Sequence, residues 1–265
     1  MKRLFISLLT AALFFTGAAG LEARIIGKQV TYRSGSTVLK GYIAWDNSRQ
    51  GRRPGIIVVH EWWGHNAYAR KRARMLAGLG YTAFALDMYG NGKQARHPKE
   101  AMAFSGAVSK NMPQAVARFK AAMRVLKRHR TVNRRKIGAI GYCFGGGVVL
   151  EMARRGLRLR RVASFHGSLG TKNPARRGRV RAQILVLNGA ADKFVKASAI
   201  AAFKKEMRKA RVRFKFVNYP GAIHAFTNPG STAIGKKFKL PLAYNAEADY
   251  ASWKEMQRFF RKAFR

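Results

Sequence analysis

The only cysteine of this 265-residue chain, Cys143, stands in a setting that can make its thiol a nucleophile. It is the centre of Gly141-Tyr142-Cys143-Phe144-Gly145, which is the strand–turn–helix motif G-x-S-x-G with cysteine in place of serine. Glycines two positions before and after leave room for the sharp turn, and a helix amino terminus beneath the sulfur favours a thiolate. A structural cysteine buried in a glycine-rich turn is the alternative. The strand-like run before the motif and the helical pattern after it favour the nucleophile.

A thiol nucleophile needs a general base, and the base needs a carboxylate that orients it. Asp192 and His224 follow Cys143 in the order nucleophile, acid, histidine, which is the order that accompanies this motif. Each lies in a loop just after a strand-like run. A loop aspartate is often only a turn residue, and a loop histidine is often only solvated, but three such residues in order predict a triad. His166, at the end of another run, is the rival base, although it precedes the acid.

The loop after residues 55–59 reads His60-Glu61-Trp62-Trp63-Gly64. In chains with this motif, such a loop supplies one backbone N–H to the oxyanion hole and the residue after the nucleophile supplies the other, so we assign Trp62 and Phe144. Glu61 has two interpretations: its carboxylate accepts a hydrogen bond from the resting thiol, or it is bonded to loop backbone. His60 and His65 do not have the H-E-x-x-H zinc spacing, so we predict no metal.

Strand-like and helical segments alternate from residue 55 onward, which predicts a mostly parallel sheet with helices on both faces. Ligands of such sheets bind outside the carboxyl ends of the strands, where all three predicted triad residues fall. We predict strands over residues 28–33, 37–45, 55–60, 81–86, 136–141, 162–166, 184–188 and 212–219. We predict helices over residues 66–79, 113–130, 197–210 and 246–264, and one that follows the glycine-rich turn and ends at residue 155.

The amino terminus has the pattern of an export signal. Lys2 and Arg3 precede an apolar run over residues 4–15, and small residues follow over 16–20. The run is shorter than the roughly 20 residues of a membrane span, although an uncleaved anchor is an alternative. We predict a signal peptide over residues 1–23, cleaved near Gly20 or Ala23, and a single domain over 24–265. The mature protein would be exported, and periplasmic in a bacterium.

The charge of the chain is extreme: 53 lysines and arginines against 11 aspartates and glutamates give +42. A field of this strength attracts nucleic acid and other polyanions. The basic residues are spread along the chain, however, and no specific nucleic-acid motif is present. A surface made basic by deliberate supercharging is one explanation, and a naturally basic protein is the other. The rival function is therefore a scaffold with an idle site whose surface binds polyanions nonspecifically.

Together the motifs around Glu61, Cys143, Asp192 and His224 resemble the dienelactone hydrolase (carboxymethylenebutenolidase) family over about residues 28–262. The resemblance implies an eight-stranded α/β-hydrolase with a Cys-His-Asp triad, without cofactor and often monomeric. It implies that Glu61 pairs with the resting thiol and releases it as thiolate when an anionic lactone binds. It also implies action on dienelactones from the degradation of aromatic rings.

Two departures from the family pattern bear on the substrate. The best-known members are cytosolic, whereas this chain has an export signal. Members that grip the substrate carboxylate use arginines, one of them four residues after the catalytic histidine, where this chain has Asn228. The other arginine falls near Tyr89 and Lys93, and none is evident there. We therefore expect a hydrolase of a small ester or lactone, dienelactone or broader, that works through a thioester acyl-enzyme.

Overall fold

The structure, a computed structural model, describes residues 24–264, and the predicted signal peptide over residues 1–23 lies outside them. The described chain forms one sheet of eight strands in the order β1-β2-β4-β3-β5-β6-β7-β8. The strands are β1 (Ile25–Ser34), β2 (Thr37–Asp46), β3 (Arg53–Val59), β4 (Thr82–Ala85), β5 (Val132–Tyr142), β6 (Arg161–Phe165), β7 (Gln183–Gly189) and β8 (Phe214–Tyr219).

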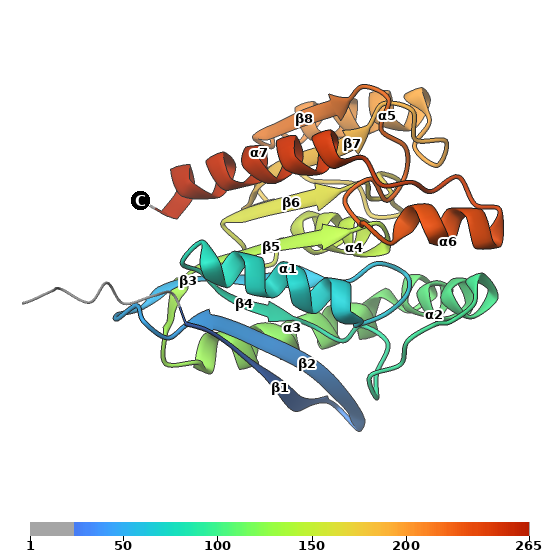
Figure 1. The fold of residues 1–265 in the computed structure, drawn as a ribbon. Coiled ribbons are helices and arrows are strands. Elements are labelled where there is room, and N and C mark those ends of the chain that lie inside the picture. Colours follow the sequence, from blue (N-terminus) through green and yellow to red (C-terminus); the bar gives the residue numbers. More distant parts are fainter. Residues whose placement is uncertain (1–23, 265) are drawn as a thin grey trace, which may run out of the picture.

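Strands β3 to β8 run parallel to one another, and β2 pairs antiparallel with both β1 and β4. Figure 1 shows the carboxyl ends of the parallel strands at one edge of the sheet. The helices are α1 (Ala67–Gly78), α2 (Pro98–Lys110), α3 (Met112–Arg128), α4 (Phe144–Arg154), α5 (Ala197–Lys209), α6 (Ser231–Phe238) and α7 (Ala246–Phe264).

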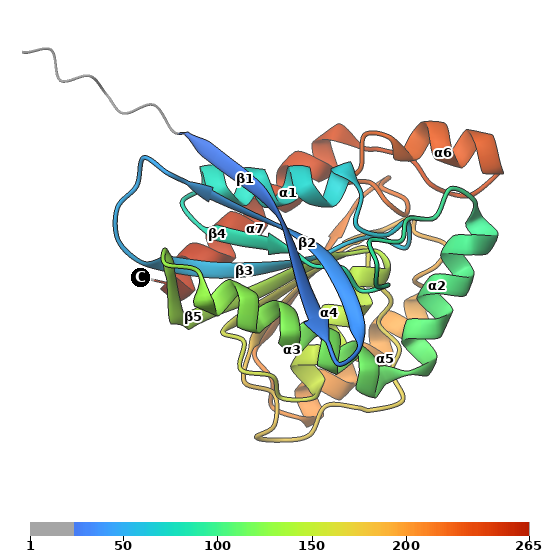
Figure 2. The same ribbon diagram turned by 90° about the horizontal axis from the view of Figure 1, so that it is seen from below.

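Helices cover both faces of the sheet: α1 and α7 pack on one face and α3, α4 and α5 on the other (Figure 2). Successive strand residues point to opposite faces. Ile56 and Val58 accordingly pack in the apolar cluster beneath α1 and α7, whereas Ile57 and Val59 pack in the larger cluster beneath α3, α4 and α5. A sheet that is buried on both faces needs near-continuous apolar strands, which is why those short runs were readable in the sequence.

The predicted fold class is confirmed, with eight strands in a mostly parallel sheet and helices on both faces. Two helices were not predicted, α2 and α6. Both project beyond the carboxyl edge of the strands (Figure 1). Between residues 24 and 264, no helix is both long and apolar enough to cross a membrane.

Candidate active site

Cys143 lies on a strained turn between the end of β5 and the start of α4. Its backbone has φ +53° and ψ −118°, a left-handed conformation that few residues other than glycine adopt. A Cβ atom on Gly141 would lie 2.0 Å from the carbonyl oxygen of Gly145, and one on Gly145 would lie 2.4 Å from that of Val59. The turn therefore requires both glycines of the motif, and it lifts the sulfur above the strand end.

Three side chains that are far apart in sequence form one hydrogen-bonded chain at the carboxyl edge of the sheet. Nε2 of His224 lies 3.1 Å from Sγ of Cys143. Nδ1 of His224 lies 2.8 Å from Oδ2 of Asp192, and Oδ1 of Asp192 accepts the backbone N–H of Phe194 at 2.8 Å. The carboxylate is thus held by its own turn while it orients the imidazole, so His224 can exchange a proton with the sulfur.

The surroundings of His224 favour its protonated form. Burial lowers its pKa, but negative charge on the sulfur of Cys143 and the hydrogen bond that the ring donates to Asp192 outweigh burial and raise the pKa to about 10. Only 7% of His224 and 5% of Asp192 is exposed, so water screens these charges weakly. The negatively charged surroundings thus favour the imidazolium form of His224.

A cavity of about 260 Å³ opens beside the sulfur. Most of its wall is apolar, from Trp62, Trp63, Phe144, Phe194, Val195, Leu240 and Leu242. Phe194 also packs edge-on against His224, with ring centroids 4.9 Å apart. Among the described residues, the ionisable groups of the wall are Glu61, Cys143 and His224, and no lysine or arginine contributes to it. The cavity therefore fits a small, mostly apolar group and offers an anion no lysine or arginine as a partner.

Glu61 adopts a contact other than the one expected from the family resemblance. Its Oε2 accepts a hydrogen bond from Nδ2 of Asn228 at 2.7 Å, while the sulfur is paired with His224. Asn228 also accepts the N–H of Gly230, so its amide is fixed and holds the carboxylate. Burial raises the pKa of Glu61 to about 7, against the lowering effects of Asn228 and His224. The expected pairing of Glu61 with the thiol is thus absent from this structure.

A model of the dienelactone hydrolase family matches residues 39–264. The chain belongs to this family. It is therefore a carboxylic ester hydrolase, acting on an ester or lactone.

Individual relatives agree with the family match. A putative carboxymethylenebutenolidase of Aquifex aeolicus is 25% identical over 207 residues, which are 77% of this chain and 88% of the relative. An uncharacterised protein of Caenorhabditis elegans is 36% identical over 152 residues, 56% of this chain and 92% of the relative. Among solved structures, a dienelactone hydrolase-like promiscuous phosphotriesterase from metagenomic libraries is 32% identical with a TM-score of 0.84, covering 91% of this chain and 99% of that one.

The two backbone N–H groups predicted for the oxyanion hole both belong to residues that line the cavity. Phe144 is the first residue of α4, where a backbone N–H has no acceptor within the helix. The carbonyl of Trp62 accepts the hydroxyl of Tyr89 at 2.8 Å, which fixes its loop. His60, beside it, accepts the N–H of Met88 at Nε2, and its Nδ1 contacts the carbonyl of Glu61. Both ring nitrogens of His60 thus contact backbone atoms.

His166, the rival base of the sequence analysis, lies behind the site with both ring nitrogens engaged. Its Nδ1 accepts the backbone N–H of Cys143 at 3.1 Å, so the ring proton is on Nε2, which donates to Oγ1 of Thr227 at 2.8 Å. Burial, together with the neighbouring His224, lowers the pKa of His166 well below its usual range. A neutral ring with no free nitrogen supports the turn instead of acting as the base.

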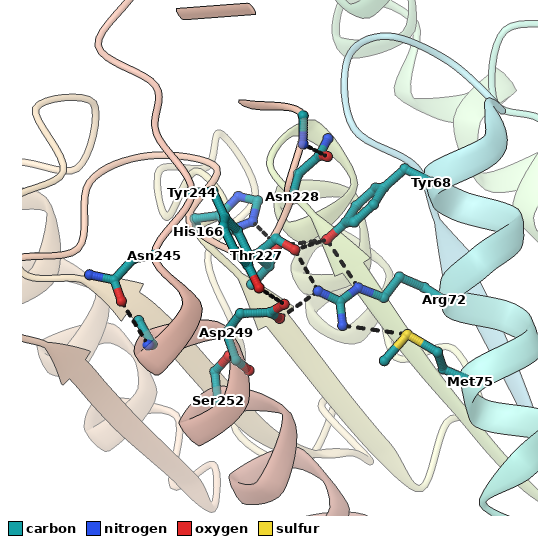
Figure 3. Close-up of polar contacts among 12 residues, drawn as sticks. Tyr68, Arg72, Met75, His166, Thr227, Asn228, Tyr244, Asn245, Asp249 and Ser252 are labelled. Atoms are coloured by element: carbon teal, nitrogen blue, oxygen red, sulfur yellow. Dashed lines mark hydrogen bonds and ion pairs between the residues drawn. The ribbon is translucent and has the colours of Figure 1, made fainter. Parts of the chain in front are cut away.

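Thr227 connects this ring to a buried arginine, as Figure 3 shows. Its hydroxyl lies 2.7 Å from that of Tyr68, and its carbonyl accepts Arg72 at 2.6 Å. Arg72 is paired with Asp249 of α7. The cluster therefore ties together α1, α7, the turn of Cys143 and the loop that carries His224. We did not predict it, because Tyr68 matched an ordinary apolar helix position and Arg72 one of many basic residues.

Proposed function

We propose that this enzyme hydrolyses small uncharged esters or lactones through a thioester on Cys143. The hydrogen-bonded chain from Sγ of Cys143 through His224 to Asp192 carries the proposal, with distances of 3.1 Å and 2.8 Å. A sulfur at a helix amino terminus, paired with an oriented imidazole, is an activated nucleophile.

The reaction proceeds in two half-reactions. The Cys143 thiolate attacks the carbonyl carbon, and the N–H groups of Trp62 and Phe144 hold the oxyanion. When the C–O bond breaks, the His224 imidazolium gives its proton to the departing alkoxide, which leaves an acyl thioester. His224 then takes a proton from water, and the resulting hydroxide attacks the thioester carbon. The acid is released and the sulfur departs as thiolate, while Asp192 keeps the imidazole in its orientation throughout.

The wall of the cavity supports an uncharged substrate. No lysine or arginine among the described residues lines it, and the one fixed carboxylate, Glu61, repels an anion. At 6 Å and an effective dielectric constant of 20, two like charges repel by about 3 kcal/mol. A lactone that carries a carboxylate would meet this repulsion at Glu61, whereas a short neutral acyl group would fill apolar space. A neutral phosphotriester also belongs among the test substrates, because one similar structure is named a phosphotriesterase.

Replacement of the nucleophile tests this proposal. In Cys143→Ala, kcat/KM for 4-nitrophenyl acetate should fall by about 10³-fold or more, because the step that forms the acyl-enzyme is lost. Ser109→Ala is the matched control: it removes a hydroxyl from the wall of the same cavity and should retain most of the activity. Mass spectrometry of the wild type with excess ester should find one acyl group on Cys143. Unchanged hydrolysis by the alanine variant would refute the assignment.

Binding of polyanions by the basic surface is the rival function. The family match favours hydrolysis, and the two properties can coexist because surface charge and cavity lie in different parts of the molecule.

A further inference from the structure

A second concavity, of about 450 Å³, lies far from the cavity of Cys143. It is lined by Arg160, Arg161, Val180, Arg181, Ala182, Gln183, Arg211, Val212, Arg213 and Lys262. Arg161 and Gln183 begin β6 and β7, and Arg213 immediately precedes β8. The concavity, called here the basic groove, therefore lies at the amino ends of these parallel strands, opposite the edge that carries the catalytic residues (Figure 1).

The basic groove concentrates six positive charges without compensation. Five arginines and one lysine line it, and among the described residues no aspartate or glutamate does. The carboxylate of Glu255 lines the adjoining depression. It is already bound by Lys215 at 2.8 Å and by Arg258 at 2.7 Å. The six positive charges of the groove repel one another, and a bound anion would reduce this repulsion.

Arg161 is the residue that distinguishes this groove from a merely basic surface. Five arginines are buried between residues 24 and 264, namely Arg53, Arg72, Arg118, Arg154 and Arg161. The first four donate side-chain hydrogen bonds to carbonyl or carboxylate oxygens.

Arg161 has no such acceptor among the described residues, although only 8% of it is exposed. Its guanidinium lies 4.7 Å from the ring centroid of Phe259. Burial and the nearby Arg213 lower its pKa. The side chain is largely covered, but its nitrogens are not among the buried polar atoms that lack a partner and they line the open groove, so an anion in the groove could replace water as their acceptor.

We propose that the basic groove binds a compact polyphosphate, of the pyrophosphate or tripolyphosphate type, with Arg161 at its base. Arginine forks match phosphate oxygens in a bidentate manner. Exposed guanidinium groups from Arg160, Arg181, Arg211 and Arg213 surround the buried one, so successive phosphates meet donors from several sides. The groove is a bounded hollow, which suits a small anion better than an extended strand.

The experiment must separate this groove from the general field of a chain with charge +42. Inorganic tripolyphosphate is titrated calorimetrically into the full-length protein at 0.15 M NaCl, where the screening length is about 8 Å. The test variant is Arg161→Gln with Arg213→Gln. The control, Arg124→Gln with Arg128→Gln on α3, removes the same charge from exposed positions outside the groove. A second test pair, Arg160→Gln with Arg211→Gln, changes only exposed residues, so that a loss of binding in this pair cannot be attributed to misfolding.

The wild type should bind one tripolyphosphate per chain. Both groove pairs should weaken binding at least tenfold, and the control pair less than twofold, with ester hydrolysis unchanged in all. An equal loss in groove and control pairs would assign the binding to the diffuse field and overturn the proposal, as would the absence of saturable one-to-one binding. An oligonucleotide that binds more tightly, and weakens equally in all pairs, would indicate a nucleic-acid surface instead and would also overturn it.

Discussion

At the scale of single residues, the site consists of one thiol, one imidazole and two carboxylates that have different roles. Asp192 is bound by its own turn and by His224, whereas Glu61 is held by Asn228 and faces the cavity. Sequence could locate Cys143, Asp192 and His224, because each follows an apolar strand. It could not find the partner of Glu61, since Asn228 lies 167 positions away and only the fold brings them together.

Glu61 should govern discrimination between neutral and anionic esters. The ratio of kcat/KM for 4-nitrophenyl hexanoate to that for mono-4-nitrophenyl adipate should rise as pH passes upward through about 7, where Glu61 loses its proton. Below that pH the carboxyl is neutral and the repulsion is absent. The ratio cancels the ionisation of the thiol and of His224, and 1 M NaCl reduces the range of surface charges to about 3 Å.

In Glu61→Gln, the ratio should be lower by about 100-fold above pH 8 and independent of pH, because the isosteric amide carries no charge. The amide retains a group that can bond to Asn228. A ratio that changes with pH in the glutamine variant as it does in the wild type would remove Glu61 from this role.

At the scale of elements, the site depends on loops that strands place and on a buried cluster that ties them together. The strands were predicted from their continuous apolar runs, but α2 and α6 were not. Helix α2 begins with a capping box of His97 and Glu100 around Pro98, a weak signal in the sequence because histidine is not one of the usual N-cap residues. Helix α6 has eight residues with Gly235 among them, too few for a helical period to stand out. Contacts between residues far apart in the chain, such as that between Thr227 and His166, leave no local pattern in the sequence.

Thr227→Val should separate positioning from folding. The methyl group keeps the volume but leaves the Nε2–H of His166 without an acceptor, which costs about 1–3 kcal/mol. We expect kcat to fall roughly tenfold, an increase of about 1.4 kcal/mol in the barrier, with KM nearly unchanged, because Thr227 does not line the cavity. The pH dependence of the rate at which iodoacetamide alkylates Cys143 should also differ from that of the wild type.

Thr227→Ser keeps the hydroxyl and should restore both kcat and the alkylation profile. If valine and serine variants have equal turnover while only thermal stability differs, Thr227 is structural and the positioning role fails.

At the scale of the whole molecule, the sheet and its two apolar layers follow from the sequence pattern, whereas the charge distribution does not follow from the fold. Buried arginines such as Arg72 and Arg154 are paired with carboxylates. Most of the 53 basic side chains cannot be paired, since the chain holds only 11 acidic residues. Self-repulsion of this kind destabilises a compact state.

Thermal stability should therefore rise with ionic strength. Raising NaCl from 0.01 M to 1 M shortens the screening length from about 30 Å to about 3 Å. The melting temperature should increase by several degrees, at about 2–4 °C for each kcal/mol in a protein of this size. Differential scanning calorimetry measures it, with the neutral osmolyte sucrose as a control for effects unrelated to charge. A melting temperature that is constant or lower in salt would contradict the expectation.

Because Cys143 is the only cysteine of the sequence, the enzyme has no internal thiol with which to reverse oxidation of its sulfur. Peroxide converts an exposed thiolate to sulfenic acid, which many proteins rescue by condensing it with a neighbouring cysteine. Cys143 has no such neighbour, because the sequence holds no second cysteine. Recovery would depend wholly on thiols supplied from outside, and without them each oxidative event would advance toward irreversible sulfinic and sulfonic products.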